Sequence, residues 1–369
     1  MREQWIHTGF AQRLHLGAGV LTTLPDILKE LGARRVLLVT TEGRLASPEG
    51  ERVVNRIGRL HDSTFAGVKS HNPTSSVEAA VRQLRRDAVD TVVSFGGGSC
   101  MDMGKALVYF QEQQAGIPGA SYADRPALRH VAIPTTYSGA ELTPFFGMTD
   151  ERTRTKNGAG GPTCAPVAVL FDPELTLTTP VNVTAETAMN ALAHCVEAVY
   201  AVVRTPEAEA VALAGAARIA TALPAVVADP GGLEIRTTLL AGAALAGRAL
   251  QNASMGAHHG LAQQLGGRTG ISHGLANALL LAHVMRFNME AVPDELMLVG
   301  AAVGDATDPA GAVARLAASV GLPARIRDVG VDEADLAAIA ATAPRNGNVQ
   351  RNPRRVTEDD ARAILEAAW

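Results

Sequence analysis

The pattern of apolar runs along the chain constrains its fold more than any other sequence feature. Within the first 180 residues, continuous apolar runs such as Val36–Val39 and Thr91–Phe95 alternate with helix-like segments such as Val77–Asp87. Continuous apolar runs are typical of strands that are buried on both faces. Alternating strands and helices predict a mostly parallel sheet with helices on both faces, which is an α/β domain.

The second half of the chain has a different pattern. From Thr184 to Asn288 it is almost entirely helix-forming and rich in Ala and Leu, and Asp294–Trp369 also has a helical pattern. A chain of 369 residues exceeds what one hydrophobic core usually supports. We therefore predict an α/β domain over residues 1–173 and an all-helical domain over residues 174–369, with the change at the Pro173 and Pro180 turns.

Composition excludes several classes of protein. The 33 Lys and Arg nearly balance the 37 Asp and Glu, and no basic stripe carries interleaved aromatics, so we expect no nucleic-acid partner. The apolar stretch 211–227 is interrupted by Arg218 and falls short of a membrane span, so we expect no membrane partner. The three cysteines form no CxxC pair and the N-terminus has no apolar signal segment. These features favour a cytoplasmic protein.

A glycine turn follows the strand at Thr91–Phe95. Gly96, Gly97, Gly98 and Ser99 come directly before a helix-like segment, and backbone N–H groups there can approach a phosphate closely. The turn has no GxGxxG spacing. Two interpretations are open: a pyrophosphate site, or an ordinary strand–helix turn in which Ser99 and Asp102 form a capping box.

The end of the first predicted strand bears on the choice of cofactor. An acidic residue there usually binds a ribose 2′-OH, whereas a 2′-phosphate excludes one. Thr40 and Thr41 leave room for a phosphate and Arg44 can pair with it, while Glu42 points the other way. The sequence favours NADPH slightly over NADH.

Several histidines occur at metal-ligand spacing in the helical half. Asn190 and His194 are four residues apart, His258 and His259 lie on a second segment, and His273 precedes a third. Imidazoles from separate helices can build a metal site, although each histidine taken alone can equally be a surface or core residue. Asn190 weakens the site, because a neutral amide oxygen binds a dication less well than a carboxylate does.

Taken together, these motifs resemble the iron-containing alcohol dehydrogenase family, and the maleylacetate reductase branch in particular. The likeness runs in order along nearly the whole chain and is carried by GGGSCMDMGKA, IPTTYSGAELTPFFG, LFDPELTLTTP, MNALAHCVEAVYA, HHGLAQQLGG, SHGLANALLLAHVMRFN and NPRRVTEDDARAILEAAW. The resemblance implies the dehydroquinate-synthase-like fold, with the active site between an α/β and a helical domain. A homodimer is a common habit of the family.

The resemblance also implies roles for individual residues. The expected cofactor-binding residues are Gly96, Gly97, Gly98, Ser99, Asp102, Thr135, Thr136 and Ser138, to which the end of the first predicted strand adds Thr41. The expected metal-binding residues are Asn190, His194, His259 and His273. With Asn190 in place of the family's Asp, we expect Fe²⁺ or Zn²⁺ to bind weakly.

The chain departs from the reductase branch next to the paired histidines. That branch continues HHKLCH, whereas this chain has HHGLAQ, so Gly260 replaces a lysine and Gln263 a histidine. Glutamine can orient a substrate but cannot act as a general acid. Arg152, Arg154 and Lys156 are candidate partners for an anionic substrate, or simply solvated charges.

The function predicted first is hydride transfer between NAD(P)H and a small carbonyl or enone carboxylate. We expect His258, His259, Gln263 and Lys156 to be its catalytic residues. The second hypothesis is oxidation of a secondary alcohol, such as a β-hydroxy acid that then loses its carboxylate. A third is a descendant of the fold that catalyses no redox reaction, which the intact GGGS and PTT motifs disfavour.

Overall fold

The computed structural model of the chain describes residues 4–116, 128–153 and 155–369. These residues form two compact units. Of the described residues, those in the ranges 9–136 and 140–178 form the α/β unit, and those in the ranges 4–8, 137–139 and 179–369 form the helical unit. The chain thus changes unit between Thr178 and Thr179, compared with the boundary predicted between residues 173 and 174.

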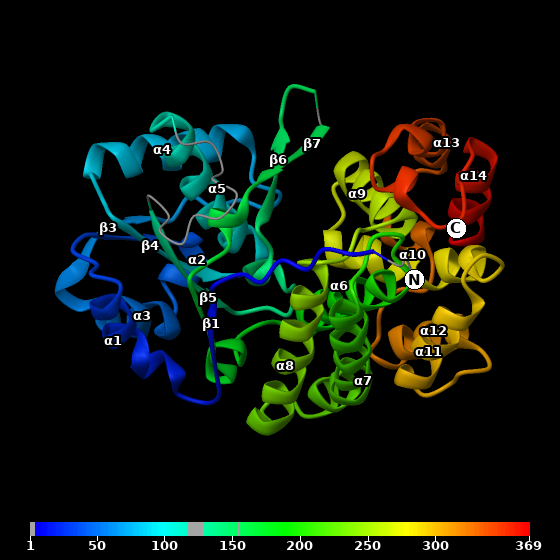
Figure 1. Ribbon diagram of the computed structural model, residues 1–369, viewed down its shortest axis with the longest axis horizontal. Coiled ribbons are helices and arrows are strands. Elements are labelled where there is room, and N and C mark those ends of the chain that lie inside the picture. The colour runs from blue at the N-terminus through cyan, green and yellow to red at the C-terminus, as the bar shows by residue number, and fades with distance from the viewer. Residues whose placement is uncertain (1–3, 117–127, 154) are drawn as a thin grey trace. The chain divides into compact units, whose positions relative to one another are not determined.

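The α/β unit is built on a six-stranded parallel sheet with the strand order β1-β8-β5-β4-β2-β3 (Figure 1). Its strands are β1 (Arg13–Leu16), β2 (Val36–Val39), β3 (His61–Phe65), β4 (Thr91–Gly96), β5 (Arg129–Pro134) and β8 (Ala168–Phe171). Its helices are α1 (Leu24–Glu30), α2 (Glu42–Leu45), α3 (Pro48–Ile57), α4 (Thr74–Asp87) and α5 (Gly98–Gln114). Short 3₁₀ turns lie at Val20–Thr23, Gly58–Leu60, Ala140–Leu142, Pro162–Cys164 and Pro173–Thr176.

Burial on both faces explains the apolar runs that predicted the central strands. Every residue of β2 is fully buried. Val36 and Leu38 pack with α1 and α3 in one core cluster, and the alternating residues Leu37 and Val39 face the opposite side. α5 packs against β4 and β5. The predicted parallel sheet is confirmed.

Three parts of this unit differ from what the sequence alone indicates. β1, β3 and β8 were not identified as strands: β1 and β3 are rich in polar residues and partly exposed, and β8 is a four-residue apolar run that was not singled out. The capping-box interpretation is wrong: α5 begins at Gly98 with Gly97 as its N-cap and no side-chain cap, so Ser99 lies inside the first turn. Arg152 lies in the turn of an antiparallel hairpin of β6 (Phe145–Asp150) and β7 (Thr155–Gly160).

The helical unit confirms the all-helical prediction for the second half of the chain. Its helices are α6 (Val181–Tyr200), α7 (Pro206–Ala228), α8 (Leu233–Leu250), α9 (Ala257–Thr269), α10 (His273–Asn288), α11 (Pro293–Val303), α12 (Pro309–Ser319), α13 (Glu333–Thr342) and α14 (Glu358–Ala367). Three 3₁₀ turns lie at Ile326–Val329, Ala343–Arg345 and Val349–Arg351. Side-chain caps define several helix starts, including Thr205 for α7, Ser272 for α10 and a Thr357–Asp360 capping box for α14.

Small residues let the helices of this unit approach one another closely. A Cβ on Gly215 of α7 would lie 2.9 Å from Cys195 Sγ and 3.1 Å from the carbonyl oxygen of Gly242 on α8. The Ala- and Gly-rich composition therefore reflects tight helix packing, in which small side chains substitute for aromatic bulk.

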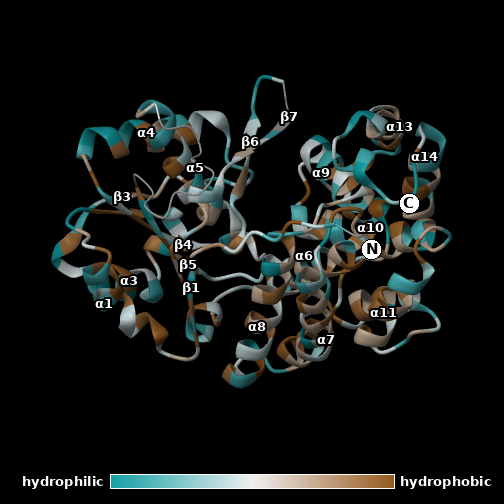
Figure 2. Cartoon of the chain, viewed as in Figure 1, coloured by the Kyte–Doolittle hydropathy of each residue, from teal (hydrophilic) through white to brown (hydrophobic). Residues whose placement is uncertain are grey.

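α7 is also the one helix in the described ranges that is long and apolar enough to cross a membrane by length and composition. Hydrophobic residues recur along it (Figure 2). It packs against α6, α8 and α11, and a core helix of a helical bundle has the same composition.

Candidate active site

The predicted nucleotide-binding residues of the α/β unit lie at the carboxyl ends of three adjacent strands. Thr41 follows β2, the Gly96–Ser99 turn follows β4, and Thr135–Thr136 follow β5. β4 lies between β2 and β5 in the sheet, and Gly96 pairs in register with Pro134. This carboxyl edge is where parallel α/β sheets bind their ligands.

The Gly96–Ser99 turn has the geometry of a phosphate cradle. Gly96 has a φ of +141°, and a Cβ there would lie 2.6 Å from Cys100 Sγ. A Cβ on Gly97 would lie 3.2 Å from Thr136 Cγ2. The turn leads into the 17-residue helix α5, whose first N–H groups have no side-chain cap. Exposed N–H donors and the helix dipole suit a pyrophosphate.

A buried hydroxyl lies beside this cradle. Thr136 is 7% exposed, and its Oγ1 has no hydrogen-bond partner among the described residues. Buried hydroxyls are normally satisfied, so an orphaned one fits a ligand group at this position. The residues of the carboxyl edge therefore fit a dinucleotide.

Asp102 has protein partners of its own. One carboxylate oxygen accepts a hydrogen bond from Gly147 N at 3.1 Å, and the other lies 2.7 Å from Lys105 Nζ. Lys105 is fully buried and also donates to the carbonyl oxygens of Ala140 and Phe145. Asp102 and Lys105 together brace the start of the hairpin against α5.

Ser138 lies in the helical unit, within residues 137–139. Its carbonyl oxygen accepts a hydrogen bond from Asn190 Nδ2 at 3.3 Å. Thr135 and Thr136 are in the α/β unit. The predicted PTTYS segment thus changes unit within the motif itself, which sequence spacing does not show.

In the helical unit, three predicted ligands come together from three helices. His194 of α6 stacks on His259 of α9 with ring centroids 4.6 Å apart, and the His259 and His273 centroids are 5.8 Å apart. His194 and His259 are buried, whereas His273 at the start of α10 is half-buried. We call these three side chains the imidazole triad.

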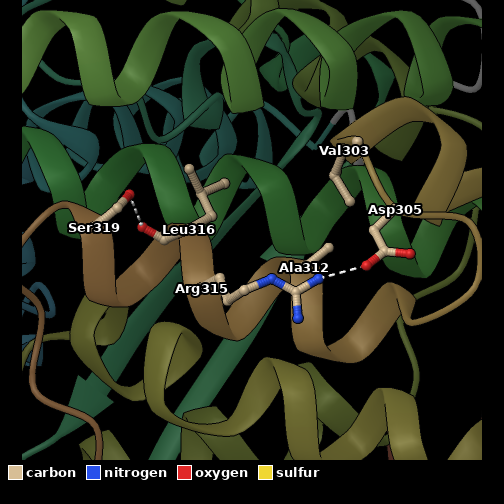
Figure 3. Close-up of a pocket in the computed structure, with 7 residues that line it drawn as sticks. Val303, Asp305, Ala312, Arg315, Leu316 and Ser319 are labelled. Carbon is tan, nitrogen blue, oxygen red and sulfur yellow. Dashed lines mark hydrogen bonds and ion pairs between the residues drawn. The ribbon is translucent and has the colours of Figure 1, made fainter.

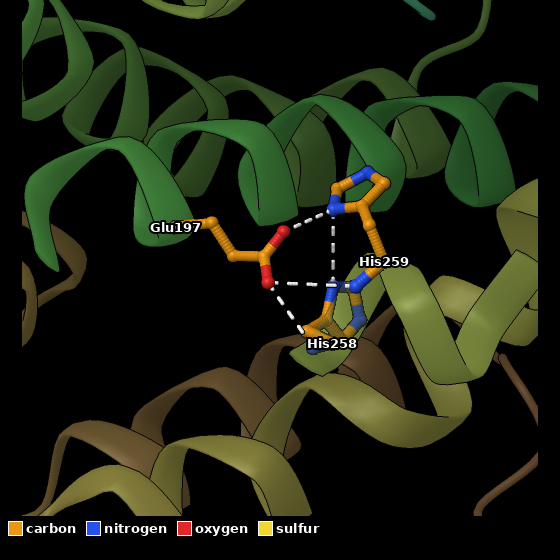
Figure 4. Close-up of side chains that lie close together, drawn as sticks. All are labelled: Glu197, His258 and His259. Carbon is orange, nitrogen blue, oxygen red and sulfur yellow. Dashed lines mark hydrogen bonds and ion pairs between the residues drawn. The ribbon is translucent and has the colours of Figure 1, made fainter. Parts of the chain in front are cut away.

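A buried carboxylate holds His259 in place. Oε2 of Glu197 accepts a 2.5 Å hydrogen bond from His259 Nδ1, and Oε1 accepts bonds from the backbone N–H groups of Gly256 and His258 at 3.0 and 3.1 Å (Figure 4). Glu197 thus caps the start of α9 and orients a ring on it. Because Nδ1 carries the proton, the lone pair of His259 is on Nε2, the arrangement typical of metal-binding histidines.

His258 has a different environment from its neighbour. It is fully buried, its Nε2 lies 3.0 Å from the carbonyl oxygen of Asn277, and its Nδ1 lies 3.4 Å from His259 Nδ1. Burial and the adjacent His259 lower the pKa of His258 to about 4. A neutral ring that donates from Nε2 to α10 and presents a lone pair toward His259 accounts for these contacts.

The remaining predicted ligand, Asn190, is engaged on both sides of its amide. Its Oδ1 accepts a hydrogen bond from Asn277 Nδ2 at 3.0 Å, while its Nδ2 donates to Ser138 O. Burial lowers the pKa of His194 well below its usual value, with His259 and His258 adding to the effect. His194 is thereby kept neutral, which is the form that binds a metal.

The donor set fits a divalent transition metal on the triad. Three neutral imidazoles suit Fe²⁺ or Zn²⁺. His194 Nδ1 is buried without a hydrogen-bond partner among the residues that the structure covers. Glu197, His258 and His259 also group within 4.8 Å, but both oxygens of Glu197 are used in orienting α9 and His259. We therefore infer that Glu197 and His258 position His259 and are not themselves metal ligands.

Two predicted catalytic residues lie apart from this core of contacts. Gln263 is one turn beyond His259 on α9, on the same helix face, and its Oε1 accepts a hydrogen bond from Asn348 Nδ2 at 3.3 Å. Lys156 lies on β7, opposite Thr149 in register. Its side chain, like the whole of Arg154, is outside the described residues.

A surface hollow of ≈ 300 Å³ elsewhere on the helical unit contains none of the predicted residues. It lies beside α11 and α12 and is lined by Val303, Gly304, Asp305, Ala312, Arg315, Leu316 and Ser319 (Figure 3). Arg315 is paired there with Asp305 at 2.6 Å and with Asp308 at 3.1 Å. Because its charge is already paired, the hollow offers little for recognition of an anion.

Comparison with known proteins shows which family the chain belongs to. Residues 11–173 match the model of iron-containing alcohol dehydrogenases, and residues 184–369 match that of the C-terminal part of the Fe-containing alcohol dehydrogenase family. The chain is 34% identical to maleylacetate reductase 1 of Rhodococcus opacus, over 99% of this chain and 96% of that protein. It is 32% identical to 1,3-propanediol dehydrogenase of Citrobacter freundii, over 96% of both.

Solved structures give the same result. The crystal structure of maleylacetate reductase from Agrobacterium tumefaciens superposes with a TM-score of 0.88 at 31% identity, covering 100% of this chain and 99% of that one. Fold and site thus define a nicotinamide-dependent oxidoreductase with an α/β and a helical part. The chain belongs to the iron-containing alcohol dehydrogenase family and is an NAD(P)-dependent oxidoreductase.

Sequence reasoning missed the residues that orient the site. Glu197, Asn277 and Asn348 hold His259, Asn190 and Gln263, respectively. One of them left a signal: Glu197 is three residues after His194 on a largely apolar helix, and a carboxylate on a buried helix face needs a partner. Asn348 left none, because its contact depends on how a distant turn packs on α9.

Proposed function

We propose that this protein reduces maleylacetate, or a closely related enone carboxylate, with NADH or NADPH. The observation that carries the proposal is the imidazole triad, in which Glu197 fixes the ring of His259 through its Nδ1. Relatives named maleylacetate reductase, 34% and 33% identical over nearly the whole chain, support the choice of substrate.

The reaction needs a hydride donor, a polarised substrate oxygen and a proton. Gly96–Ser99, Thr135 and Thr136 would hold a nicotinamide dinucleotide, which would supply the hydride. His194, His259 and His273 would hold a divalent metal, which would supply Lewis-acid polarisation of the keto oxygen. Hydride adds to the carbon–carbon double bond conjugated with that keto group, and the resulting enolate takes a proton on carbon.

The chain's own residues divide the remaining work. His258 donates from Nε2 to Asn277 O, so we assign it to positioning His259 rather than to delivering a proton. Gln263 has an amide and no titratable proton, so the proton comes from solvent water. With Asn190 already held by Asn277, we expect weak metal binding in which Fe²⁺ and Zn²⁺ both fit the triad.

We further propose NADPH as the preferred cofactor, with Thr41 and Arg44 near the 2′-phosphate. Thr41 caps α2, accepting a hydrogen bond from Arg44 N at 3.2 Å, and Arg44 Nη1 donates to Thr178 at 2.9 Å. An arginine held at the end of β2 suits a 2′-phosphate. We also propose that Lys156 binds an anionic group of the substrate. The protein is proposed to be a homodimer and to be located in the cytoplasm.

The test is to follow absorbance of the reduced nicotinamide. NADPH or NADH is mixed with maleylacetate, and, in parallel, NADP⁺ or NAD⁺ is mixed with β-hydroxy acids and simple secondary alcohols. We expect oxidation of the reduced cofactor with maleylacetate and a higher kcat/KM with NADPH. No turnover of maleylacetate with either cofactor, at concentrations where the cofactor binds, would overturn the proposal.

Oxidation of a secondary alcohol is the second candidate. The observation that favours it is Gln263, because the position lacks the titratable side chain of the reductase branch. The similarity to 1,3-propanediol dehydrogenase supports it as well. Reduction of NAD(P)⁺ with an alcohol, in the absence of maleylacetate turnover, would establish this alternative.

A further inference from the structure

Gln263 has a single hydrogen-bond partner among the residues that the structure describes. Its Oε1 accepts from Asn348 Nδ2 at 3.3 Å. An amide side chain carries an acceptor at one end and two donors at the other. Since the acceptor end is held by Asn348, the Nε2 end of Gln263 is left as a donor. The side chain is half-buried, so this donor is accessible to a small molecule.

The turn that carries Asn348 is itself well ordered by hydrogen bonds. Asn346 Oδ1 accepts bonds from the backbone N–H groups of Asn348 and Val349 at 2.9 and 3.3 Å. A few residues on, Asn352 Oδ1 accepts a bond from Ala257 N at 3.1 Å, at the first turn of α9. Residues 346–352, which we call the asparagine turn, therefore bind α9 at Ala257 in its first turn and again at Gln263, nearly two turns further along.

Gly260 makes this approach feasible. A Cβ at that position would lie 2.5 Å from Val349 Cγ2, 3.0 Å from Asn346 Oδ1 and 3.1 Å from Val349 N. The contacts with Val349 N and Asn346 Oδ1 involve the backbone of the turn and the side chain that orders it. Any residue larger than glycine at position 260 would therefore displace the turn. Gly260 and Asn348 thus act together: the first admits the turn and the second contacts Gln263.

Gln263 is on the same helix as His259 of the imidazole triad. It is four residues after His259, on the same face of α9. If the keto oxygen of a substrate binds at the triad, the amide of Gln263 is a candidate donor to another oxygen of that substrate. A charge-free donor recognises a carbonyl or carboxylate oxygen and exchanges no proton with it.

We propose that Asn348 is a positioning residue that fixes Gln263 as a hydrogen-bond donor to a carboxylate oxygen of the substrate, and that Gly260 is what admits it. The inference rests on the proposed function, because it names the substrate group next to the reacting ketone. Under this proposal, Gly260, Gln263 and Asn348 determine which substrate binds, and none of them acts as an acid or a base in the reaction.

The test compares two matched substitutions in the same turn. Asn348→Asp removes the donor that holds Gln263 Oε1. The new carboxylate can only accept a hydrogen bond, so the side-chain amide of Gln263 would rotate to present Nε2 to it. Asn346→Asp adds the same charge two residues away but keeps the Oδ1 acceptor that orders the turn. Each variant is assayed for maleylacetate reduction and for binding of maleate, a dicarboxylate that needs no turnover.

For Asn348→Asp we expect KM for maleylacetate and the dissociation constant of maleate to rise by about 10- to 100-fold, the usual cost of a hydrogen bond to a charged group. We expect kcat to stay within about twofold, because the lost contact stabilises the bound substrate and the transition state equally. NADH affinity should be unchanged, because the residues assigned to NADH do not include Asn348. Asn346→Asp should match the wild type. Gly260→Ala should reproduce the rise in KM while it remains folded by circular dichroism.

Equal rises in KM for the two Asp variants, or no rise for Asn348→Asp, would overturn the inference. The proposed function fails separately: if the wild type binds maleate but does not turn over maleylacetate, the reaction is wrong and the maleate data still test Asn348. If the wild type does not bind maleate at all, the carboxylate-recognition inference is wrong, whether or not NADH binds.

Discussion

At the carboxyl edge of the α/β unit, the candidate cofactor-binding groups are backbone N–H groups and threonine hydroxyls. In the helical unit, the candidate groups are imidazoles, and one of them is held by a buried carboxylate. The phosphate cradle of the first set, Gly96–Ser99, is one continuous stretch of chain, in which a Cβ on Gly96 would lie 2.6 Å from Cys100 Sγ. The second depends on helices that are distant in sequence.

This difference teaches how each site will respond to substitution. A glycine turn loses its ligand when a side chain is added, because its backbone N–H groups bind the ligand only if the turn keeps its conformation and its space. An imidazole set fails when an orienting partner is removed, even if every ring remains. The predictions below test this contrast, from the largest expected effect to the smallest.

The largest effect is expected from loss of the oriented imidazole. His259→Ala should lower kcat by about 10²–10³, the range seen when a group that stabilises developing charge on oxygen is removed. NADH affinity should be unchanged, because the carboxyl edge does not include this residue. Steady-state kinetics and a fluorescence titration with NADH check both parts. A kcat within about threefold of wild type would contradict the role of the triad.

Removing only the orienting charge should have a smaller effect. Glu197→Gln keeps the shape of the side chain but weakens its hold on His259 Nδ1, so metal affinity or activity should fall by about 10- to 100-fold. Glu234→Gln, in the first turn of α8, is the matched control. Elemental analysis after Fe²⁺ loading and kcat measure the effect; equal behaviour of the two variants would show that Glu197 is not an orienting group.

At the carboxyl edge, Gly96→Ala should weaken NADH binding by at least about tenfold. The backbone at Gly96 has a φ of +141° and a Cβ would collide with Cys100 Sγ. The strain itself costs about 1–3 kcal/mol, so thermal unfolding must be recorded beside the NADH titration. Gly267→Ala on α9, where a Cβ meets nothing within 4 Å, is the control. Unchanged NADH affinity in Gly96→Ala would argue against the phosphate cradle.

The smallest effect concerns pH and a buried carboxyl of the α/β unit. Glu141 is fully buried, and burial raises its pKa from 4.5 to about 7. The folded protein therefore holds the proton more tightly than the unfolded chain. The stabilisation is fully present below about pH 4.5 and is lost as pH rises through about 7.

Glu141→Gln should remove this loss and stabilise the α/β unit above neutral pH by on the order of 1–3 kcal/mol. Denaturant unfolding of wild type and variant at pH values on both sides of neutrality measures it. A wild-type free energy of unfolding that does not fall relative to the variant as pH rises would show that the carboxyl is already ionised in the folded state.

The sequence predicts the central strands and the position of the glycine turn because both are local. Val36–Val39 and Thr91–Phe95 carry their own burial pattern, and both are strands. The three histidines were identified by spacing and resemblance. The orienting residues were not: Glu197 contacts His259 62 residues away, and Asn348 contacts Gln263 85 residues away. Such contacts follow from helix packing, which no local pattern encodes.

The same reason explains the error at Ser99. Ser-x-x-Asp is a valid local signal for a capping box. Asp102 is instead held by Lys105 and Gly147, and α5 begins at Gly98, two residues earlier than a box with Ser99 as N-cap requires. The side chain of Asp102 is thus held by Lys105 and by Gly147, which is distant in sequence, and not by the backbone of Ser99.

The most direct test of the division of labour between the two units is a pair of titrations on the same two variants. NADH and Fe²⁺ dissociation constants are measured for Gly96→Ala and His259→Ala beside the wild type. We predict that Gly96→Ala loses NADH affinity and keeps Fe²⁺ affinity, and that His259→Ala does the reverse. If either substitution abolishes both affinities in a folded protein, or if neither changes its own ligand, the assignment of nucleotide and metal to separate units is contradicted.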